Sequence, residues 1–327
     1  MASRVTRGMN RLIKVSNEVW SRSTKSSLMV GRGWQSNGIV LQAKRMPFVI
    51  LTVPATTTLF YERYGAHGVP ILFLHGGWGY SLYPIDFQLL ALLQKHEVWI
   101  PRRSGYGRSS RVHHFELTFH KIAALEMLAF LESCNISRCV VWGHSDGAVI
   151  AAWMGLLEPQ RLCGLVLEAF HFYRRKERSI EFFSMAATRP QEVREKAQLI
   201  LQSEHGDNWR DVIRISGEAW LRLILGEEQT ADLYEGHLYS LSVPTLLIHS
   251  QNDPRTEPLE IKDAVKHLPT AACHVLDAGG HSPHSHPETR ELCTQLIQSF
   301  VEEVTSPPQF SQEQAPLEKR IHRKDTL

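Results

Sequence analysis

Short apolar runs alternate with helical stretches along residues 48–304, and this alternation constrains the fold more than any other feature of the sequence. Short apolar runs suit strands that are buried on both faces of a parallel sheet. Strands that alternate with helices predict a mainly parallel sheet covered by helices on both faces, which is the α/β class. The predicted strands are 48–53, 58–64, 69–74, 98–100, 139–142, 165–167, 245–248 and 272–276, and the predicted core helices are 85–94, 117–131, 148–157, 261–268 and 288–304.

One stretch, residues 171–242, interrupts this alternation and has no strand pattern. The insertion falls at the sheet edge where ligands bind such folds, so we expect a helical cap over a site. Surface decoration without a role is the alternative. The α/β core is then expected at residues 46–170 and 243–304. The helices predicted within the cap are 180–187, 190–203, 209–225 and 228–239.

The two ends of the chain differ from the core in composition. Residues 1–45 are rich in Lys and Arg and contain a single acid, Glu18. A basic, acid-poor segment with helical spacing of its charges is typical of a mitochondrial targeting peptide. A disordered extension and a start codon placed too early are the alternatives, so we expect a cytoplasmic or mitochondrial protein. Residues 305–327 combine prolines with a charged run, which predicts a disordered tail.

The composition excludes several classes of function. The net charge is only +2, which gives no reason to expect nucleic acid as a partner. No apolar run reaches the roughly 18 residues that a membrane-spanning helix needs. The five cysteines are odd in number and lack CxxC spacing, so we expect reduced thiols rather than disulfides or a zinc site. We expect no metal and no cofactor, and the oligomeric state is open.

The segment Gly143-His144-Ser145-Asp146-Gly147 lies between a predicted strand and a predicted helix. A serine in a sharp strand-to-helix turn needs small residues two positions before and after it, and the turn pushes its hydroxyl out of the sheet. Ser145 is therefore the predicted nucleophile. We expect His144 to be a packed side chain of the turn.

A serine nucleophile needs a base, and the base needs an acid that holds its tautomer. On a fold of this kind the chain order is serine, acid, histidine. Asp253 follows the strand at 245–248, and His281 follows the strand at 272–276. The neighbouring Asn252 cannot carry the required charge. Two other histidines, His284 and His286, are expected to be polar loop residues.

Five stretches resemble the α/β-hydrolase family in order and spacing, and the resemblance spans about residues 57–303. It implies Ser145 as nucleophile, Asp253 as acid and His281 as base, with the backbone N–H groups of Gly77 and Asp146 as the oxyanion hole. The sequence departs from the family at residues 101–104 and 250, which affects loop shape and specificity rather than the three catalytic positions. The stretches are HGGWG at 75–79, GYGRS at 105–109, GHSDG at 143–147, residues 249–258 and GH at 280–281.

The acid next to the nucleophile, Asp146, is the least common feature of this turn. Its carboxylate lies near a helix N-terminus, which by itself is stabilising. The Ser-Asp-Gly turn also resembles that of valacyclovir hydrolase-like enzymes, which implies a carboxylate that receives a substrate ammonium. Among many aromatic residues, we expect Trp78 and Phe170 to contact the substrate.

The predicted function is a serine hydrolase that cleaves a carboxylic ester, or a thioester, lactone or amide, of a small molecule through an acyl-enzyme. The same three residues also serve C–C bond hydrolysis, perhydrolysis and acyl transfer, which are the enzymatic alternatives. A ligand-binding protein that keeps the fold without turnover is the alternative outside enzymes.

Overall fold

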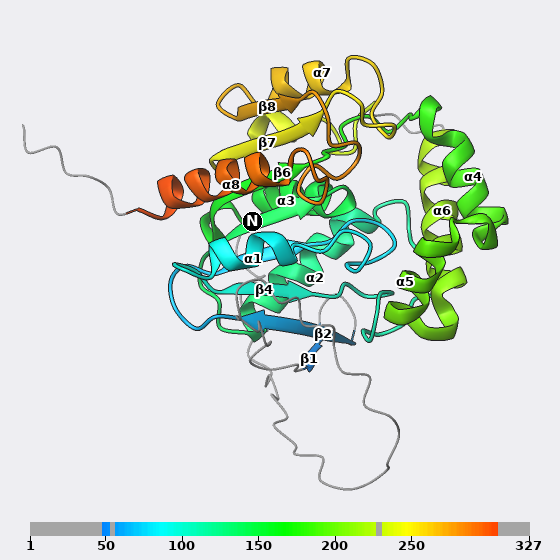
Figure 1. Ribbon diagram of the computed structural model, residues 1–327, viewed down its shortest axis with the longest axis horizontal. Coiled ribbons are helices and arrows are strands. Elements are labelled where there is room, and N and C mark those ends of the chain that lie inside the picture. Colours follow the sequence, from blue (N-terminus) through cyan, green and yellow to red (C-terminus); the bar gives the residue numbers. More distant parts are fainter. Residues whose placement is uncertain (1–47, 53–55, 227–230, 307–327) are drawn as a thin grey trace, which may run out of the picture.

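The computed structural model describes residues 48–52, 56–226 and 231–306, and these residues form an eight-stranded sheet flanked by helices (Figure 1). The strand order is β1-β2-β4-β3-β5-β6-β7-β8, and only the β1–β2 and β2–β4 pairs are antiparallel. This confirms the predicted α/β class and the mainly parallel sheet. The strands are β1 (Phe48–Leu51), β2 (Thr57–Tyr64), β3 (Ile71–Leu74), β4 (Val98–Pro101), β5 (Cys139–His144), β6 (Leu162–Glu168), β7 (Thr245–Ser250) and β8 (Ala272–Leu276).

Helices cover both faces of the sheet because its central strands are apolar on both faces. Leu72 and Leu74 of β3 pack in one cluster with α2 and α3, whereas Ile71 and Phe73 pack in another with α1 and α8. Successive side chains of a strand point to opposite faces, so one short strand serves two cores. The core helices are α1 (Asp86–Leu92), α2 (Phe119–Ser133), α3 (Asp146–Leu157), α7 (Glu260–His267) and α8 (Arg290–Thr305).

The insertion between β6 and β7 is helical and lies at one end of the sheet, on the right in Figure 1. Its helices are α4 (Ile180–Thr188), α5 (Glu195–His205) and α6 (Trp209–Leu225). The helix predicted at 228–239 is wrong for the part of it that is described, since residues 231–237 form turns before the short 3-10 helix Leu238–Ser240. Glu235 and Gly236 have φ values of 54° and 75°, and two successive positive φ angles are incompatible with a right-handed helix.

The ends of the chain contribute little to the described structure. The predicted targeting segment at 1–45 and all of the predicted tail except residues 305 and 306 lie outside the described residues, and Thr305 is the last residue of α8. Among the helices that are described, none is long and apolar enough to cross a membrane. Sequencing the N-terminus of the protein recovered from cells would test the targeting hypothesis.

Candidate active site

Ser145 lies in a strained turn between β5 and α3. Its φ of 55° and ψ of −120° fall in a region that residues with a side chain seldom occupy. A Cβ atom on Gly143 would lie 2.1 Å from the carbonyl oxygen of Gly147, and one on Gly147 would lie 2.0 Å from that of Leu74. Both positions therefore require glycine, because a neighbouring backbone carbonyl occupies the space of a side chain, as the sequence pattern predicts. The turn leaves the Ser145 hydroxyl at the carboxyl edge of the sheet.

The structure brings the three predicted catalytic residues together in one hydrogen-bonded chain. The Nε2 atom of His281 lies 2.9 Å from the Oγ atom of Ser145. The Nδ1 atom of the same ring lies 3.0 and 2.9 Å from the two carboxylate oxygens of Asp253. The three residues follow β5, β7 and β8, whose parallel carboxyl ends meet at this edge. This is the geometry of a nucleophile, a base and an orienting acid.

The Asp253 carboxylate is buried, and its environment keeps it ionised. Burial alone would raise its pKa, but the charge and hydrogen bonds of His281 outweigh burial and hold this pKa far below the usual range. The backbone N–H of Arg255 donates a further hydrogen bond of 2.7 Å to the carboxylate. The side chain is therefore a fixed anion beneath His281, which holds that ring with its Nδ1 proton toward the acid.

The two predicted oxyanion donors lie beside the nucleophile. The N–H of Asp146 is the first of α3 and therefore has no partner within the helix. The loop after β3 packs tightly on the turn, since a Cβ on Gly76 would lie 3.0 Å from the Cβ of Ser145. Gly77 follows in this loop and lines the same cavity as Ser145. A side chain at Gly76 would push this loop away from the nucleophile.

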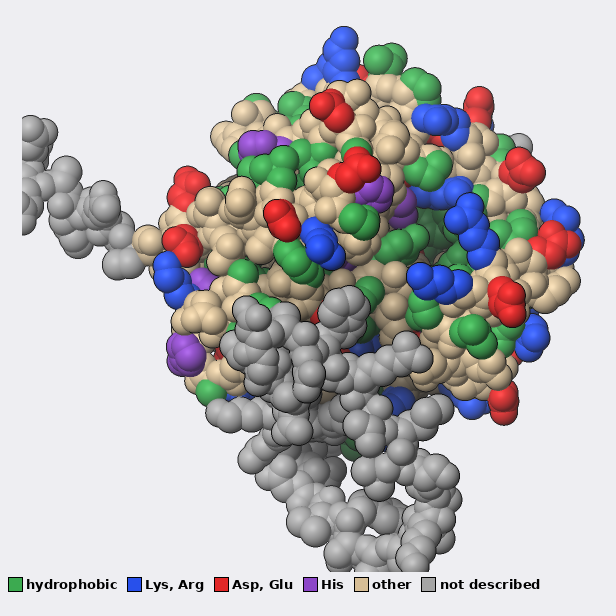
Figure 2. Space-filling view, in the orientation of Figure 1, with side chains coloured by type: hydrophobic (Ala, Val, Ile, Leu, Met, Phe, Trp, Pro, Cys, Tyr) green, Lys and Arg blue, Asp and Glu red, His purple; other side chains and the backbone are tan. Residues whose placement is uncertain are grey.

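A cavity of about 600 Å³ lies above Ser145, between the sheet edge and the helical insertion. Trp78 lines it, as predicted, and its ring stacks on that of Phe182 with 4.9 Å between centroids. In the view of Figure 2 the hollow opens beside the insertion, with Lys and Arg side chains around its rim. The insertion contributes part of the wall. Its lining residues there are His171, Phe182, Phe183, Met185, Glu192, Val193, Arg194, Ala197, Ser216 and Trp220.

The expected substrate contact at Phe170 is wrong. Its side chain is 1% exposed and belongs to the main core cluster, and it is not among the residues that line the cavity. Its ring stacks on Tyr234, with 5.4 Å between centroids and 10° between planes. Phe170 lies two residues beyond Glu168, the last residue of β6, where it packs beneath the insertion instead of facing the cavity.

The carboxylate of Asp146 is almost completely buried, at the inner end of the cavity. One oxygen, Oδ1, accepts hydrogen bonds from Trp220 Nε1 at 3.0 Å and from His120 Nε2 at 3.3 Å. The other oxygen, Oδ2, is buried without a hydrogen-bond partner. Burial raises the pKa of this carboxyl, but the hydrogen bond and charge of His120 outweigh burial and lower it below its ordinary value. An ionised oxygen is thus left unsatisfied beside the nucleophile.

Two histidines near the catalytic centre have roles that the sequence analysis missed. His171 lines the cavity and places its Nε2 atom 3.4 Å from Ser145 Oγ. His284 lies in a loop, as expected, but its side chain is fully buried and its Nδ1 lies 2.9 Å from both carboxylate oxygens of Glu168. Neither histidine belongs to a recognisable motif, so only the folded chain reveals their partners.

The His144 side chain packs within the turn, as predicted. Its Nε2 atom lies 2.7 Å from the carbonyl oxygen of His281. Burial lowers the pKa of His144 to about 3, so the ring is neutral and its Nε2–H donates to that carbonyl. His144 thereby ties the loop that carries the base to the turn that carries the nucleophile.

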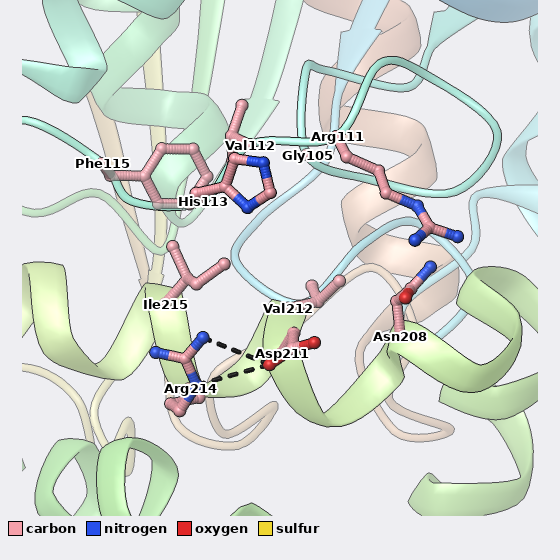
Figure 3. Close-up of a pocket in the computed structure, with 10 residues that line it drawn as sticks. All are labelled: Gly105, Arg111, Val112, His113, Phe115, Asn208, Asp211, Val212, Arg214 and Ile215. Atoms are coloured by element: carbon pink, nitrogen blue, oxygen red, sulfur yellow. Dashed lines mark hydrogen bonds and ion pairs between the residues drawn. The ribbon is translucent and has the colours of Figure 1, made fainter.

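A second, smaller hollow of about 110 Å³ lies between residues 105–115 and α6, away from the catalytic residues (Figure 3). Arg214, one of the two arginines that line it, is already held by Asp211 at 3.1 Å and by Glu218 at 2.8 Å. Among the described residues, no three His, Cys, Asp or Glu side chains converge in a way that would hold a metal ion. The cavity above Ser145 is therefore the candidate active site.

Comparison with known proteins places this fold and site in a family. The model of the alpha/beta hydrolase family matches residues 71–290, and the chain belongs to this family. Serine hydrolase BPHL from Mus musculus is 25% identical over 234 residues, which cover 69% of this chain and 77% of that protein. A probable proline iminopeptidase from Leptolyngbya boryana is 32% identical over 133 residues, which cover 39% of this chain and only 40% of that relative.

Solved structures show the same fold. A thermophilic esterase from Thermogutta terrifontis superposes with a TM-score of 0.63 at 20% identity, covering 80% of this chain and all of that one. An enol-lactonase from Burkholderia xenovorans LB400 superposes with a TM-score of 0.62 at 16% identity, covering 78% of this chain and 99% of that one. The chain is thus a member of a hydrolase family, and the proteins similar to it include ones named as an esterase, a lactonase and a peptidase.

Proposed function

We propose that the protein is a serine hydrolase that cleaves a carboxylic ester, or a related thioester, lactone or amide, of a small molecule through an acyl-enzyme. The observation that supports this most strongly is the continuous hydrogen-bonded chain from Ser145 through His281 to Asp253. Such a chain activates a hydroxyl that is otherwise a poor nucleophile. A cavity of small-molecule size lies directly above it.

In the proposed reaction, Ser145 Oγ attacks the carbonyl carbon while its proton passes to His281 Nε2. The negative oxygen that forms is stabilised by the N–H groups of Gly77 and Asp146, each worth about 10²- to 10³-fold in rate. The bond to the leaving group breaks as His281 returns the proton to it. Water then gives a proton to His281 as it attacks the acyl-enzyme. His281 returns that proton to Ser145 Oγ as the bond to the acyl group breaks and the acid leaves.

Labelling with a fluorescent fluorophosphonate tests this proposal directly, because the probe reacts with a serine that a working base has activated. We expect the parent protein to be labelled and Ser145→Ala to show no labelling. Ser285→Ala removes an exposed hydroxyl near the base and should leave labelling unchanged. A folded parent that resists the probe would contradict the proposal and favour a ligand-binding protein. Labelling without hydrolysis of any acyl substrate would favour acyl transfer, perhydrolysis or C–C bond hydrolysis.

The substrate class that we propose first is the amino-acid ester. The unsatisfied Oδ2 atom of Asp146 supports it, since a buried carboxylate oxygen beside the reacting carbonyl suits a substrate ammonium. The family resemblance of the Ser-Asp-Gly turn points in the same direction. A carboxylate whose second oxygen merely stabilises the N-terminus of α3 is the alternative account.

Asp146→Asn is expected to lower kcat/KM for L-valine benzyl ester by about 10- to 100-fold, because it removes a charged hydrogen bond. The matched benzyl 3-methylbutanoate lacks only the amino group and should lose less than about 3-fold, since asparagine keeps an oxygen for Trp220 and His120. Asp211→Asn on the exposed part of α6 is the control variant. Equal losses on the two esters would assign Asp146 a structural role alone.

A further inference from the structure

His171 is a second histidine at the nucleophile, and the mechanism above gives it no task. Its Nε2 atom lies 3.4 Å from Ser145 Oγ, while that of His281 lies 2.9 Å from the same atom. The two imidazole rings are nearly parallel, with 5.5 Å between centroids and 15° between planes. Both Nε2 atoms therefore approach the nucleophile from the same part of the cavity.

The surroundings of His171 hold its ring in one place. The hydroxyl of Tyr234 donates a 2.9 Å hydrogen bond to the His171 carbonyl, and the N–H of Phe172 donates a 2.8 Å hydrogen bond to Glu260. The ring meets Trp220 edge to face, with 5.5 Å between centroids. The side chain is 3% exposed. A polar group fixed in this way beside a reacting atom needs no rearrangement before it acts.

The hydrogen-bond pattern assigns the tautomer of His171. The Ser145 hydroxyl has one proton, and the closer acceptor for it is His281 Nε2. The contact between His171 and Ser145 is then a hydrogen bond only if His171 Nε2 carries the proton and donates it to Oγ. The other ring nitrogen, Nδ1, is buried without a partner. Burial and the nearby charge of Lys176 hold the pKa of His171 well below its ordinary value, so the ring is neutral.

The acceptor of this N–H changes during acylation. Once Ser145 Oγ is bonded to the carbonyl carbon it becomes an ester oxygen, which accepts hydrogen bonds poorly. The leaving atom must then lie close to His281 Nε2, which gives it a proton, and His171 Nε2 faces the same part of the cavity. As its bond to the carbonyl carbon breaks, the leaving oxygen of an ester gains negative charge and accepts a hydrogen bond well. A thioester sulfur accepts only weakly, and an amide nitrogen gives its lone pair to the proton from His281.

We propose that His171 is a further catalytic residue. Its Nε2–H donates a hydrogen bond to the Ser145 hydroxyl in the free enzyme, and it donates this hydrogen bond to the leaving-group oxygen during acylation. The inference rests on the acyl-enzyme function proposed above and narrows it to oxygen esters and lactones, in preference to thioesters and amides. No proton is transferred from His171 in this role, since His281 alone carries the proton between Ser145 and the leaving group.

The test compares two substrates that differ in one atom, phenyl acetate and S-phenyl thioacetate. We expect His171→Met to lower kcat/KM for phenyl acetate by about 10- to 100-fold, the usual effect of losing one hydrogen bond in a transition state. The loss with the thioester should stay below about 3-fold. His171→Gln places an amide N–H near the position of Nε2 and should recover phenyl acetate hydrolysis to within about 5-fold of the parent. His113→Met, on an exposed loop, is the matched control.

Three results would overturn the proposal: no loss of phenyl acetate hydrolysis in His171→Met, equal losses on both substrates, or a Gln variant as impaired as the Met variant. His171→Phe keeps an aromatic ring beside His281 and gives the same comparison if the Met variant is unstable. Fluorophosphonate labelling of the parent is measured first. A parent that fails to label refutes the hydrolase function itself, whereas a labelled parent with unchanged variants refutes only the role of His171.

Discussion

Asp253→Asn is expected to lower kcat by about 10⁴-fold, the loss seen when the orienting acid of such a triad becomes an amide. The amide N–H₂ of asparagine can donate to His281 Nδ1, which favours the tautomer with the proton on Nε2. His281 then has no lone pair facing Ser145 Oγ and cannot take its proton. The side chain keeps its size, so the fold should persist, although the buried acceptor of the Arg255 N–H is weakened.

The measurement is the rate of hydrolysis of an activated aryl ester, together with the rate of fluorophosphonate labelling. Asp277→Asn is the matched control, because Asp277 lies on the exposed loop after β8, where its carboxylate accepts a hydrogen bond from Gln251 at 3.0 Å. That variant should react like the parent. An Asp253→Asn protein that keeps more than about a tenth of the parent rate would show that another group orients His281.

The sequence was sufficient to predict the parts of the site that depend on local backbone geometry. The glycines around Ser145 are needed because any Cβ there would overlap the backbone, so the requirement is visible in the sequence itself. The positions of Asp253 and His281 follow from parallel strands, whose carboxyl ends meet at one edge. Motif order and strand order together therefore predicted which side chains meet.

Contacts between side chains far apart in the sequence could not be predicted in this way. Phe170 and His171 are neighbours at the end of β6, yet one stacks on Tyr234 in the core and the other lines the cavity. Which of them faces the nucleophile depends on the path of the chain into the insertion, and no periodicity encodes that path. The same limit applies to His284, which lies in the loop after β8, whereas its partner Glu168 is the last residue of β6.

The second large effect is on stability and concerns the buried pair of Glu168 and His284. Glu168 accepts hydrogen bonds from His284 Nδ1 at 2.9 Å, from the His284 N–H at 2.8 Å and from Trp142 Nε1 at 3.1 Å. The other ring nitrogen of His284 lies 3.0 Å from the carbonyl oxygen of Tyr83. Both ring nitrogens of His284 therefore face acceptors, an arrangement that favours the doubly protonated ring.

Glu168→Gln is expected to lower the free energy of unfolding by about 3 to 5 kcal/mol, because it leaves the His284 imidazolium buried without its counter-ion. The pair also anchors the loop that carries His281, so activity should fall with stability. Glu302→Gln is the matched control at an exposed ion pair with Lys95 and should leave the free energy of unfolding close to that of the parent, because solvent screens this pair. Denaturant unfolding of the three proteins at pH 7 measures these differences.

The pH dependence gives an independent check with a definite sign. Burial raises the pKa of Glu168, but the charge and hydrogen bonds of His284 outweigh burial and lower it from 4.5 to about 2. The unfolded chain therefore binds this proton more readily than the folded protein. The stabilisation by Glu168 is complete above about pH 4.5 and is lost as the pH falls toward 2. Glu168→Gln should lack this part of the acid-induced loss.

Replacing His284 together with Glu168 distinguishes the contribution of the ion pair to stability from that of side-chain packing. In Glu168→Gln with His284→Leu no unpaired charge is left in the core, so we expect the double variant to be more stable than Glu168→Gln alone. If the double variant instead loses the sum of the two single losses, the two side chains act independently, and the anchoring of the His281 loop must come from the remaining backbone and side-chain contacts of that loop.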